Sequence, residues 1–170
     1  MRILLASDFY PPHLGGVELQ VQALAQALTA QGHEVVVATV LQADQATSES
    51  IGGVRLERFR SLATIVPWFS GDPARRYHPP FPDPRLALAL RRLARRFKPE
   101  VVQTHGWIAY SAALGLVGTG IPIVLSVRDY GYFCATRNLL IEAGSVPVQN
   151  SRSASVTPVG STARPRASWP

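Results

Sequence analysis

Cysteine is almost absent from this chain of 170 residues, since Cys134 is the only one. A single cysteine excludes a disulfide within the chain and any metal site that needs several cysteines from one copy. For Cys134 itself, packing is favoured over catalysis. Charged residues are also scarce, at 16%, while 46% of the residues are hydrophobic. That balance excludes a wholly disordered chain and fits one domain, or one domain with a tail.

Long apolar runs are missing as well. No stretch of roughly 18 apolar residues exists, so no segment is expected to span a membrane. The N-terminus has an apolar stretch of only four residues before Ser7. Such a stretch is too short for the central region of a secretory signal. We therefore expect a cytoplasmic protein.

Lysine is nearly absent too: of the 17 basic residues, 16 are arginines and only Lys98 is a lysine. The formal net charge is +6, and half of it comes from residues 145–170, which contain three arginines and no acidic residue. The sequence contains no recognised nucleic-acid-binding motif and no interleaving of aromatic and basic residues. We therefore expect no nucleic-acid partner.

The chain begins with a strand–helix–strand unit. Residues 2–6 form a continuous apolar run, which predicts a strand buried on both faces. Residues 17–31 place apolar side chains on one helical face, and Gly32 ends that helix. Residues 35–40 form a second apolar strand. The right-handed crossover of such units makes the two strands parallel.

The alternation of strands and helices continues along the chain. Asp83 and Pro84 begin a helix well, because aspartate caps free amides and proline is tolerated in the first turn. The pattern predicts an α/β fold with an open, doubly wound, mostly parallel Rossmann-like sheet. The other predicted elements are strands at 53–59, 100–104 and 121–127, helices at 84–97 and 108–117, and a loop at 67–84 with six prolines.

The predicted strand at 53–59 has an imperfect alternation. Val54 and Leu56 point to one face, and a slip of one residue places Phe59 with them and Arg58 on the other face. We expect this strand to lie near an edge of the sheet.

Residues 145–170 differ in composition from the rest of the chain. Ser, Thr and Pro make up 12 of these 26 residues, and Leu, Ile and Phe are absent. Such a segment cannot bury enough apolar surface to offset the entropy of ordering. The sequence therefore predicts a folded domain over residues 1–144 and a disordered tail over residues 145–170.

Gly15 and Gly16 stand directly before the first predicted helix. Glycines let a ligand approach the backbone, and a helix N-terminus supplies amide donors and partial positive charge, which suits a phosphate. Glu18 and Arg128 complete the candidate phosphate-binding residues. Without a ligand, the glycines would form a tight turn and Glu18 would favour the helix dipole. The glycine patterns of dinucleotide-binding and Walker loops are missing.

His105 and Asp129 are the candidate catalytic residues. Each follows a predicted strand, and the loops beyond the carboxyl ends of parallel strands bind ligands in such sheets. His105 could bind a hydroxyl group or exchange a proton, or it could cap the next helix. Asp129 could orient a substrate hydroxyl or act as a base, or it could cap a turn.

Four arginines cluster in the helix that follows Asp83: Arg91, Arg92, Arg95 and Arg96. A solvated helix face, favoured by the helix dipole, is the simpler explanation. The alternative is contact with acidic lipid head groups. That contact would place the protein at the inner face of the plasma membrane.

Three segments resemble bacterial family 4 glycosyltransferases: RILLASDFYPPHLGGVELQVQALAQALTAQGHEVVVAT, FKPEVVQTHGW and GIPIVLSVRDYGYFC. Together they cover about residues 1–140 in the order and spacing of that family. The resemblance implies one half of a GT-B architecture, in which two Rossmann-like domains face a cleft. It also implies retaining, metal-independent transfer of a hexosyl group from a nucleotide sugar to a sugar or lipid-linked acceptor, with no cofactor.

The resemblance implies positions for the site residues. In that family the N-terminal domain receives the acceptor, and its Gly-Gly loop lies near the donor phosphates. Gly15, Gly16, His105 and Asp129 would then line the cleft. This chain has Arg128 where the family often has histidine, and an arginine cannot exchange protons at neutral pH.

The C-terminal donor-binding domain of the family is absent from the sequence. The change in composition after about residue 140 suggests a truncated or frame-disrupted product, which we expect to transfer little sugar alone. One alternative is a binding module for an anionic metabolite or a partner chain. Another is a subunit completed by a separately encoded donor domain.

Overall fold

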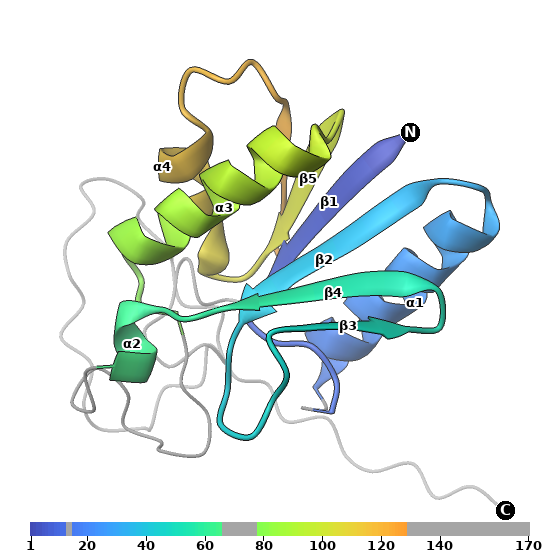
Figure 1. Ribbon diagram of the computed structural model, residues 1–170, viewed down its shortest axis with the longest axis horizontal. Helices are drawn as coiled ribbons and strands as arrows, with labels where there is room; N and C mark the ends of the chain where they lie inside the picture. Colours follow the sequence, from blue (N-terminus) through green and yellow to red (C-terminus); the bar gives the residue numbers. More distant parts are fainter. Residues whose placement is uncertain (13–14, 66–77, 129–170) are drawn as a thin grey trace, which may run out of the picture. The chain divides into compact units, whose positions relative to one another are not determined.

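A computed structural model describes residues 1–12, 15–65 and 78–128 (Figure 1). These residues belong to one compact unit with a six-stranded sheet in the order β3-β4-β2-β1-β5-β6. The strands are β1 (Arg2–Ser7), β2 (Glu34–Val40), β3 (Ser48–Ile51), β4 (Val54–Phe59), β5 (Val101–His105) and β6 (Ile123–Ser126). The helices are α1 (Gly16–Ala30), α2 (Leu62–Ile65), α3 (Pro84–Phe97) and α4 (Ile108–Leu116).

The sheet is parallel except for the pairing of β3 with β4. From β1 the chain moves outward through β2 to β4, then returns to the other side of β1 to form β5 and β6. The direction of winding therefore reverses between β1 and β5. The predicted α/β fold, doubly wound and mostly parallel, is confirmed.

Helices cover both faces of the sheet (Figure 1). On one face, Val21 and Ala25 of α1 pack with alternate residues of the inner strands, among them Leu5. On the other face, α3 and α4 pack over Leu4 and Val36. Because β1 is buried on both sides, its sequence is a continuous apolar run rather than an alternation.

The predicted start of α3 is confirmed. The Asp83 carboxylate accepts hydrogen bonds from the backbone N–H groups of Arg85 (2.9 Å) and Leu86 (3.1 Å). Pro84 occupies the first turn. These contacts satisfy amides that have no partner within the helix.

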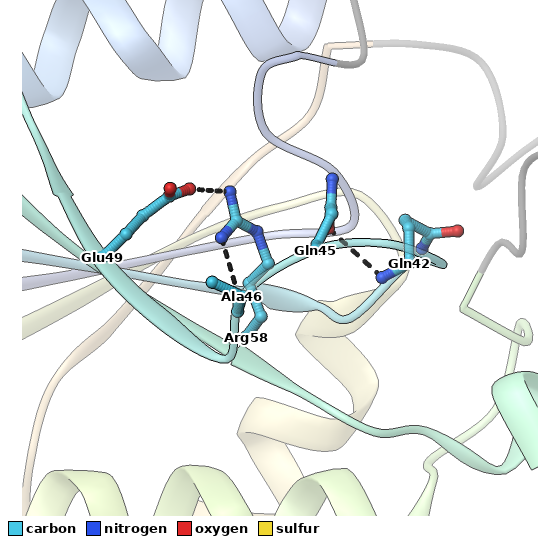
Figure 2. Close-up of polar contacts among 5 residues, drawn as sticks. All are labelled: Gln42, Gln45, Ala46, Glu49 and Arg58. Atoms are coloured by element: carbon cyan, nitrogen blue, oxygen red, sulfur yellow. Dashed lines mark hydrogen bonds and ion pairs between the residues drawn. The ribbon is translucent and has the colours of Figure 1, made fainter.

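The predicted strand at 53–59 lies near an edge of the sheet, as expected, with only β3 outside it. The predicted slip in its alternation was wrong. Arg58 is buried instead of outward, and Phe59 is only partly buried. The alternation continues without a slip because Arg58 has partners inside: it forms an ion pair with Glu49 of β3 and donates from Nη1 to the carbonyl oxygen of Ala46 at 2.8 Å (Figure 2).

The arginine cluster of α3 is also less uniform than predicted. Arg91 is partly buried, and its Nη1 donates to the carbonyl oxygens of Gly115 (3.1 Å) and Val117 (3.0 Å). Arg96 forms an ion pair with Glu57 at 3.1 Å. Arg92 and Arg95 are exposed to solvent, so a purely solvated face holds for part of the cluster only.

Other predictions lie outside the described residues. These are the boundary at residue 144, the disordered tail over residues 145–170, Asp129 and Cys134. In the ranges that the structure covers, none of the helices combines the length and the hydropathy needed to cross a bilayer.

The crossing of α3 and α4 is close enough to require a glycine. A Cβ added at Gly115 would overlap the backbone carbonyl of Ala87. We predict that Gly115→Ala lowers the free energy of unfolding by about 1–3 kcal/mol, because a backbone must shift to admit the methyl group. Gly16→Ala is the matched control, since a Cβ there meets nothing within 4 Å, and it should change stability by no more than about 0.5 kcal/mol. Urea unfolding measures both; equal effects would contradict the close crossing.

Candidate functional site

The reversal of winding between β1 and β5 places two strand ends side by side. Ser7, the last residue of β1, is paired in register with His105, the last residue of β5. Both are buried. In open parallel sheets, ligands bind beyond the carboxyl ends of the strands at such a switch point. The edge of the sheet formed by the carboxyl ends of its parallel strands is therefore the candidate site.

Asp8 follows β1 and connects the two sides of the switch point. Its carboxylate accepts hydrogen bonds from the backbone N–H groups of Trp107 (2.9 Å) and Ile108 (2.7 Å), at the start of α4. The Thr39 hydroxyl donates to the carbonyl oxygen of Asp8 at 3.1 Å. Asp8 thus caps α4. The ring nitrogens of His105 make no hydrogen bond to the described residues, so His105 does not cap that helix.

Gly106 makes this arrangement possible. Its φ of +82° is the left-handed conformation that glycine adopts readily, and a Cβ would overlap the Asp8 carboxylate. Sequence reasoning missed the role of Asp8 because a cap usually lies next to its helix. The one local signal was an aspartate directly after a strand.

His105 is buried at this edge without hydrogen-bond partners. Neither Nδ1 nor Nε2 has one among the described residues. Burial, and to a smaller extent the positive charge of Arg128, lowers the pKa of His105 from 6.5 to about 4. The imidazole is therefore neutral at physiological pH, with one nitrogen able to donate and the other able to accept a hydrogen bond.

Arg128 follows β6, the strand beside β5, and is exposed to solvent. Its positive charge contributes, after burial, to the lowered pKa of His105, so the guanidinium lies within electrostatic range of the imidazole. The structure thus brings two of the predicted site residues together. Asp129, the next residue, lies outside the described part of the chain.

Gly15 and Gly16, the two glycines of the glycine loop at the start of α1, differ in the space around them. Gly15 is the N-cap of α1, and a Cβ there would overlap the carboxylate of Glu18. A Cβ at Gly16 would meet nothing within 4 Å. An anion near Gly15 would therefore meet a like charge, whereas the open side of Gly16 adjoins the positive end of the helix dipole.

Buried polar groups also lie behind the glycine loop. Burial raises the pKa of Tyr10, and the charge of Arg58 opposes that rise. The Tyr10 hydroxyl and Nε of Arg58 are buried and have no hydrogen-bond partner among the described residues. Arg58 holds the loop that follows β2 through its hydrogen bond to the carbonyl oxygen of Ala46 (Figure 2). In the same loop, the backbone N–H of Gln42 donates to the Gln45 side chain at 3.2 Å.

No metal centre is present in the described segments, since they contain no group of three or more His, Cys, Asp or Glu side chains that could hold an ion. A hollow of about 360 Å³ lies at the opposite edge of the sheet, beside the N-terminal end of β2 and the end of α1. It is lined by His33, Glu34 and Arg55 among others, and by none of the predicted site residues.

Comparison with known proteins identifies the family. Residues 14–146 match the model of Glycosyltransferase Family 4. The chain belongs to this family. The resemblance found in the sequence is thus confirmed. The comparison with curated proteins found no match.

Solved structures of several proteins are similar to this family 4 chain. Sucrose-phosphate synthase from Thermosynechococcus elongatus is 19% identical over 73% of this chain and 31% of its own, with a TM-score of 0.49. The glycosyltransferase SsfS6 of Streptomyces sp. SF2575 is 22% identical over 74% of this chain and 38% of its own (TM-score 0.44). A deacetylase of teicoplanin biosynthesis is 16% identical over 84% of this chain and 72% of its own, with a TM-score of 0.45.

These structural likenesses carry no argument about function, because every TM-score is below 0.5. The chain spans about a third of the length of the first two proteins.

The Asp8 cap can be tested by its loss. Asp8→Ala removes the acceptor of two backbone N–H groups at the start of α4. We expect a loss of about 1–3 kcal/mol in the free energy of unfolding. Asp8→Asn keeps one acceptor oxygen and should lose less. Chemical denaturation measures both, and a cost for Asp8→Ala under about 0.5 kcal/mol would contradict the capping role.

The lowered pKa of His105 predicts how stability depends on pH. The folded state holds this pKa at about 4, against 6.5 in the unfolded chain. Between these values the unfolded chain binds more protons, so stability is full above about pH 6.5 and is lost as the pH falls toward 4. The pKa of His78 is also lowered by burial and acts in the same direction.

We therefore expect His105→Asn to flatten the decline in stability between pH 6.5 and 4 without abolishing it. Urea unfolding at a series of pH values measures the slope. A variant with the same slope as the unaltered protein would show that His105 titrates normally.

Proposed function

We propose that this chain is the acceptor-side domain of a glycosyltransferase. The reaction is the transfer of a hexosyl group from a nucleotide sugar to a hydroxyl of a sugar or lipid-linked acceptor, with retention of configuration and without a metal ion. Family membership supports sugar transfer in general. The observation that carries the assignment to this edge of the sheet is the unpartnered, neutral imidazole of His105.

His105 is suited to hold an acceptor hydroxyl. A buried polar group without a partner is costly, so a hydroxyl that enters the site and hydrogen-bonds to the imidazole recovers that cost. As a neutral group, His105 accepts from the hydroxyl or donates to it without bringing a second positive charge beside Arg128. Asp129, the residue after Arg128, is proposed to orient the same hydroxyl or to take its proton.

Arg128 and the open side of Gly16 are suited to the donor. As a sugar leaves a nucleoside diphosphate, negative charge develops on the phosphate oxygens, and fixed positive groups stabilise it. Arg128 supplies a permanent cation, and the N-terminus of α1 supplies amide donors and a partial positive charge. These two groups would do the work of a metal ion in a metal-independent reaction. The same features support the second candidate, a binding module for an anionic metabolite.

Transfer by this chain is proposed to need a donor-binding domain. The experiment therefore joins the chain to the donor-binding domain of a family 4 enzyme and measures the transfer of labelled hexose from a panel of nucleotide sugars. His105→Asn should lower transfer about 100-fold, the size of effect expected when a reacting group is no longer held in position. His33→Asn is the matched control, because His33 lies at the opposite edge of the sheet.

Gly16→Val tests the donor side in the same assay. The added side chain would fill the open space beside the helix N-terminus. Weaker binding of a nucleoside diphosphate and a loss of transfer are expected, with thermal stability retained. Full transfer by both His105→Asn and Gly16→Val would refute the proposed site. Retained nucleotide binding without transfer in any fusion would favour the binding module.

A further inference from the structure

We propose that the outer surface of α3 and α4 binds a membrane that contains anionic lipids. This α3–α4 face consists of Arg85, Leu88, Arg92, Arg95, Leu114 and Val117. The inference goes beyond the proposed function, because the candidate site lies at the carboxyl edge of the sheet, whereas these helices cover one of its faces (Figure 1).

The α3–α4 face is strongly basic. α3 contains five arginines and no acidic residue, and α4 contains no charged residue. Within the described part of the chain, Arg96 is paired with Glu57, whereas Arg85, Arg92 and Arg95 form no ion pair. Three exposed guanidinium groups with no acidic neighbour on their helix complement an anionic surface.

Large apolar side chains are exposed among these arginines. Leu88 is 48% exposed, Leu114 is 47% exposed and Val117 is 67% exposed. Leu88 lies one turn before Arg92, on the outer side of α3. A helix face that combines arginines with exposed leucines is typical of segments that lie in the interface of a bilayer. From the sequence alone, a solvated face was favoured over contact with acidic lipids. The exposed apolar residues favour the lipid contact instead.

The packing of the two helices joins the apolar residues into one surface. α3 and α4 cross at Ala87 and Gly115, and the exposed leucines are the immediate chain neighbours of these two residues. Arg91 donates to the carbonyl oxygens of Gly115 and Val117, which ties the end of α4 to α3. The apolar residues of both helices therefore face outward near the same crossing.

A lipid surface fits this face better than a nucleic acid does. A nucleic acid would use the arginines but would leave Leu88, Leu114 and Val117 in water. A bilayer satisfies both, because its phosphates bind guanidinium groups while the leucines enter the boundary of the acyl chains.

The test is co-sedimentation of the full chain with vesicles of phosphatidylcholine alone, or of phosphatidylcholine mixed with phosphatidylglycerol. We expect binding to the mixed vesicles only, weakening as salt is added. Arg92→Gln should weaken binding about fivefold, and the pair R92Q/R95Q about 30-fold, from the usual contribution of an arginine at such a surface. Leu88→Ser, which preserves the charge, should weaken it about threefold or more.

Arg60→Gln is the matched control. Arg60 is an exposed arginine that follows β4, outside the α3–α4 face, and its loss should change binding less than twofold. Circular dichroism confirms that each variant is folded, since every altered side chain is exposed or partly exposed. Equal binding to neutral vesicles, or equal effects of R92Q and R60Q, would overturn the proposal. So would binding of an RNA oligonucleotide through Arg92 and Arg95 in the absence of vesicle binding.

Discussion

The candidate site depends on the hydrogen bonds between the Asp8 carboxylate and the start of α4. The carboxylate lies at the end of the central strand and binds the first amides of α4. Since the winding of the sheet reverses between β1 and β5, this contact spans the point where a ligand can approach the strand ends. The left-handed Gly106 allows the chain to pass the carboxylate. The chain is thereby fixed on both sides of His105, by the pairing of β5 with β1 before it and by the Asp8 cap after it.

A second constraint lies on the other side of β1. Arg58 is a buried cation, and burying a charge is costly unless it is paired and hydrogen-bonded. Its pairing with Glu49 and with the carbonyl oxygen of Ala46 joins β4, β3 and the loop after β2. The same guanidinium acts on Tyr10, which leads into the glycine loop. Arg58 thus holds β3, β4 and the loop after β2 together, while the Asp8 cap holds the start of α4 next to His105.

The two proposals assign different surfaces of one small domain to different tasks. The carboxyl edge has a neutral buried imidazole and a cation, which suits an uncharged hydroxyl beside an anionic phosphate. The α3–α4 face has exposed arginines and leucines, which suits a lipid surface. Because α3 and α4 pack on each other and on the sheet, the α3–α4 face and the sheet belong to one compact unit. An acceptor carried by a lipid would then be presented to an edge of the same sheet.

Local patterns were sufficient to predict five of the strands and the three longer helices, because apolar periodicity and helix caps depend on neighbouring residues; the short β3 and α2 were not predicted. The apolar run at residues 2–6 and the Asp83–Pro84 start of α3 are examples. Periodicity failed at Arg58, whose partner lies on a short strand, SESI, without apolar alternation. Asp8 binds amides 99 and 100 residues away in the chain, and His105 is unpartnered and neutral only because other elements enclose it. Such contacts between distant residues arise from the packing of the whole sheet, and no local pattern encodes them.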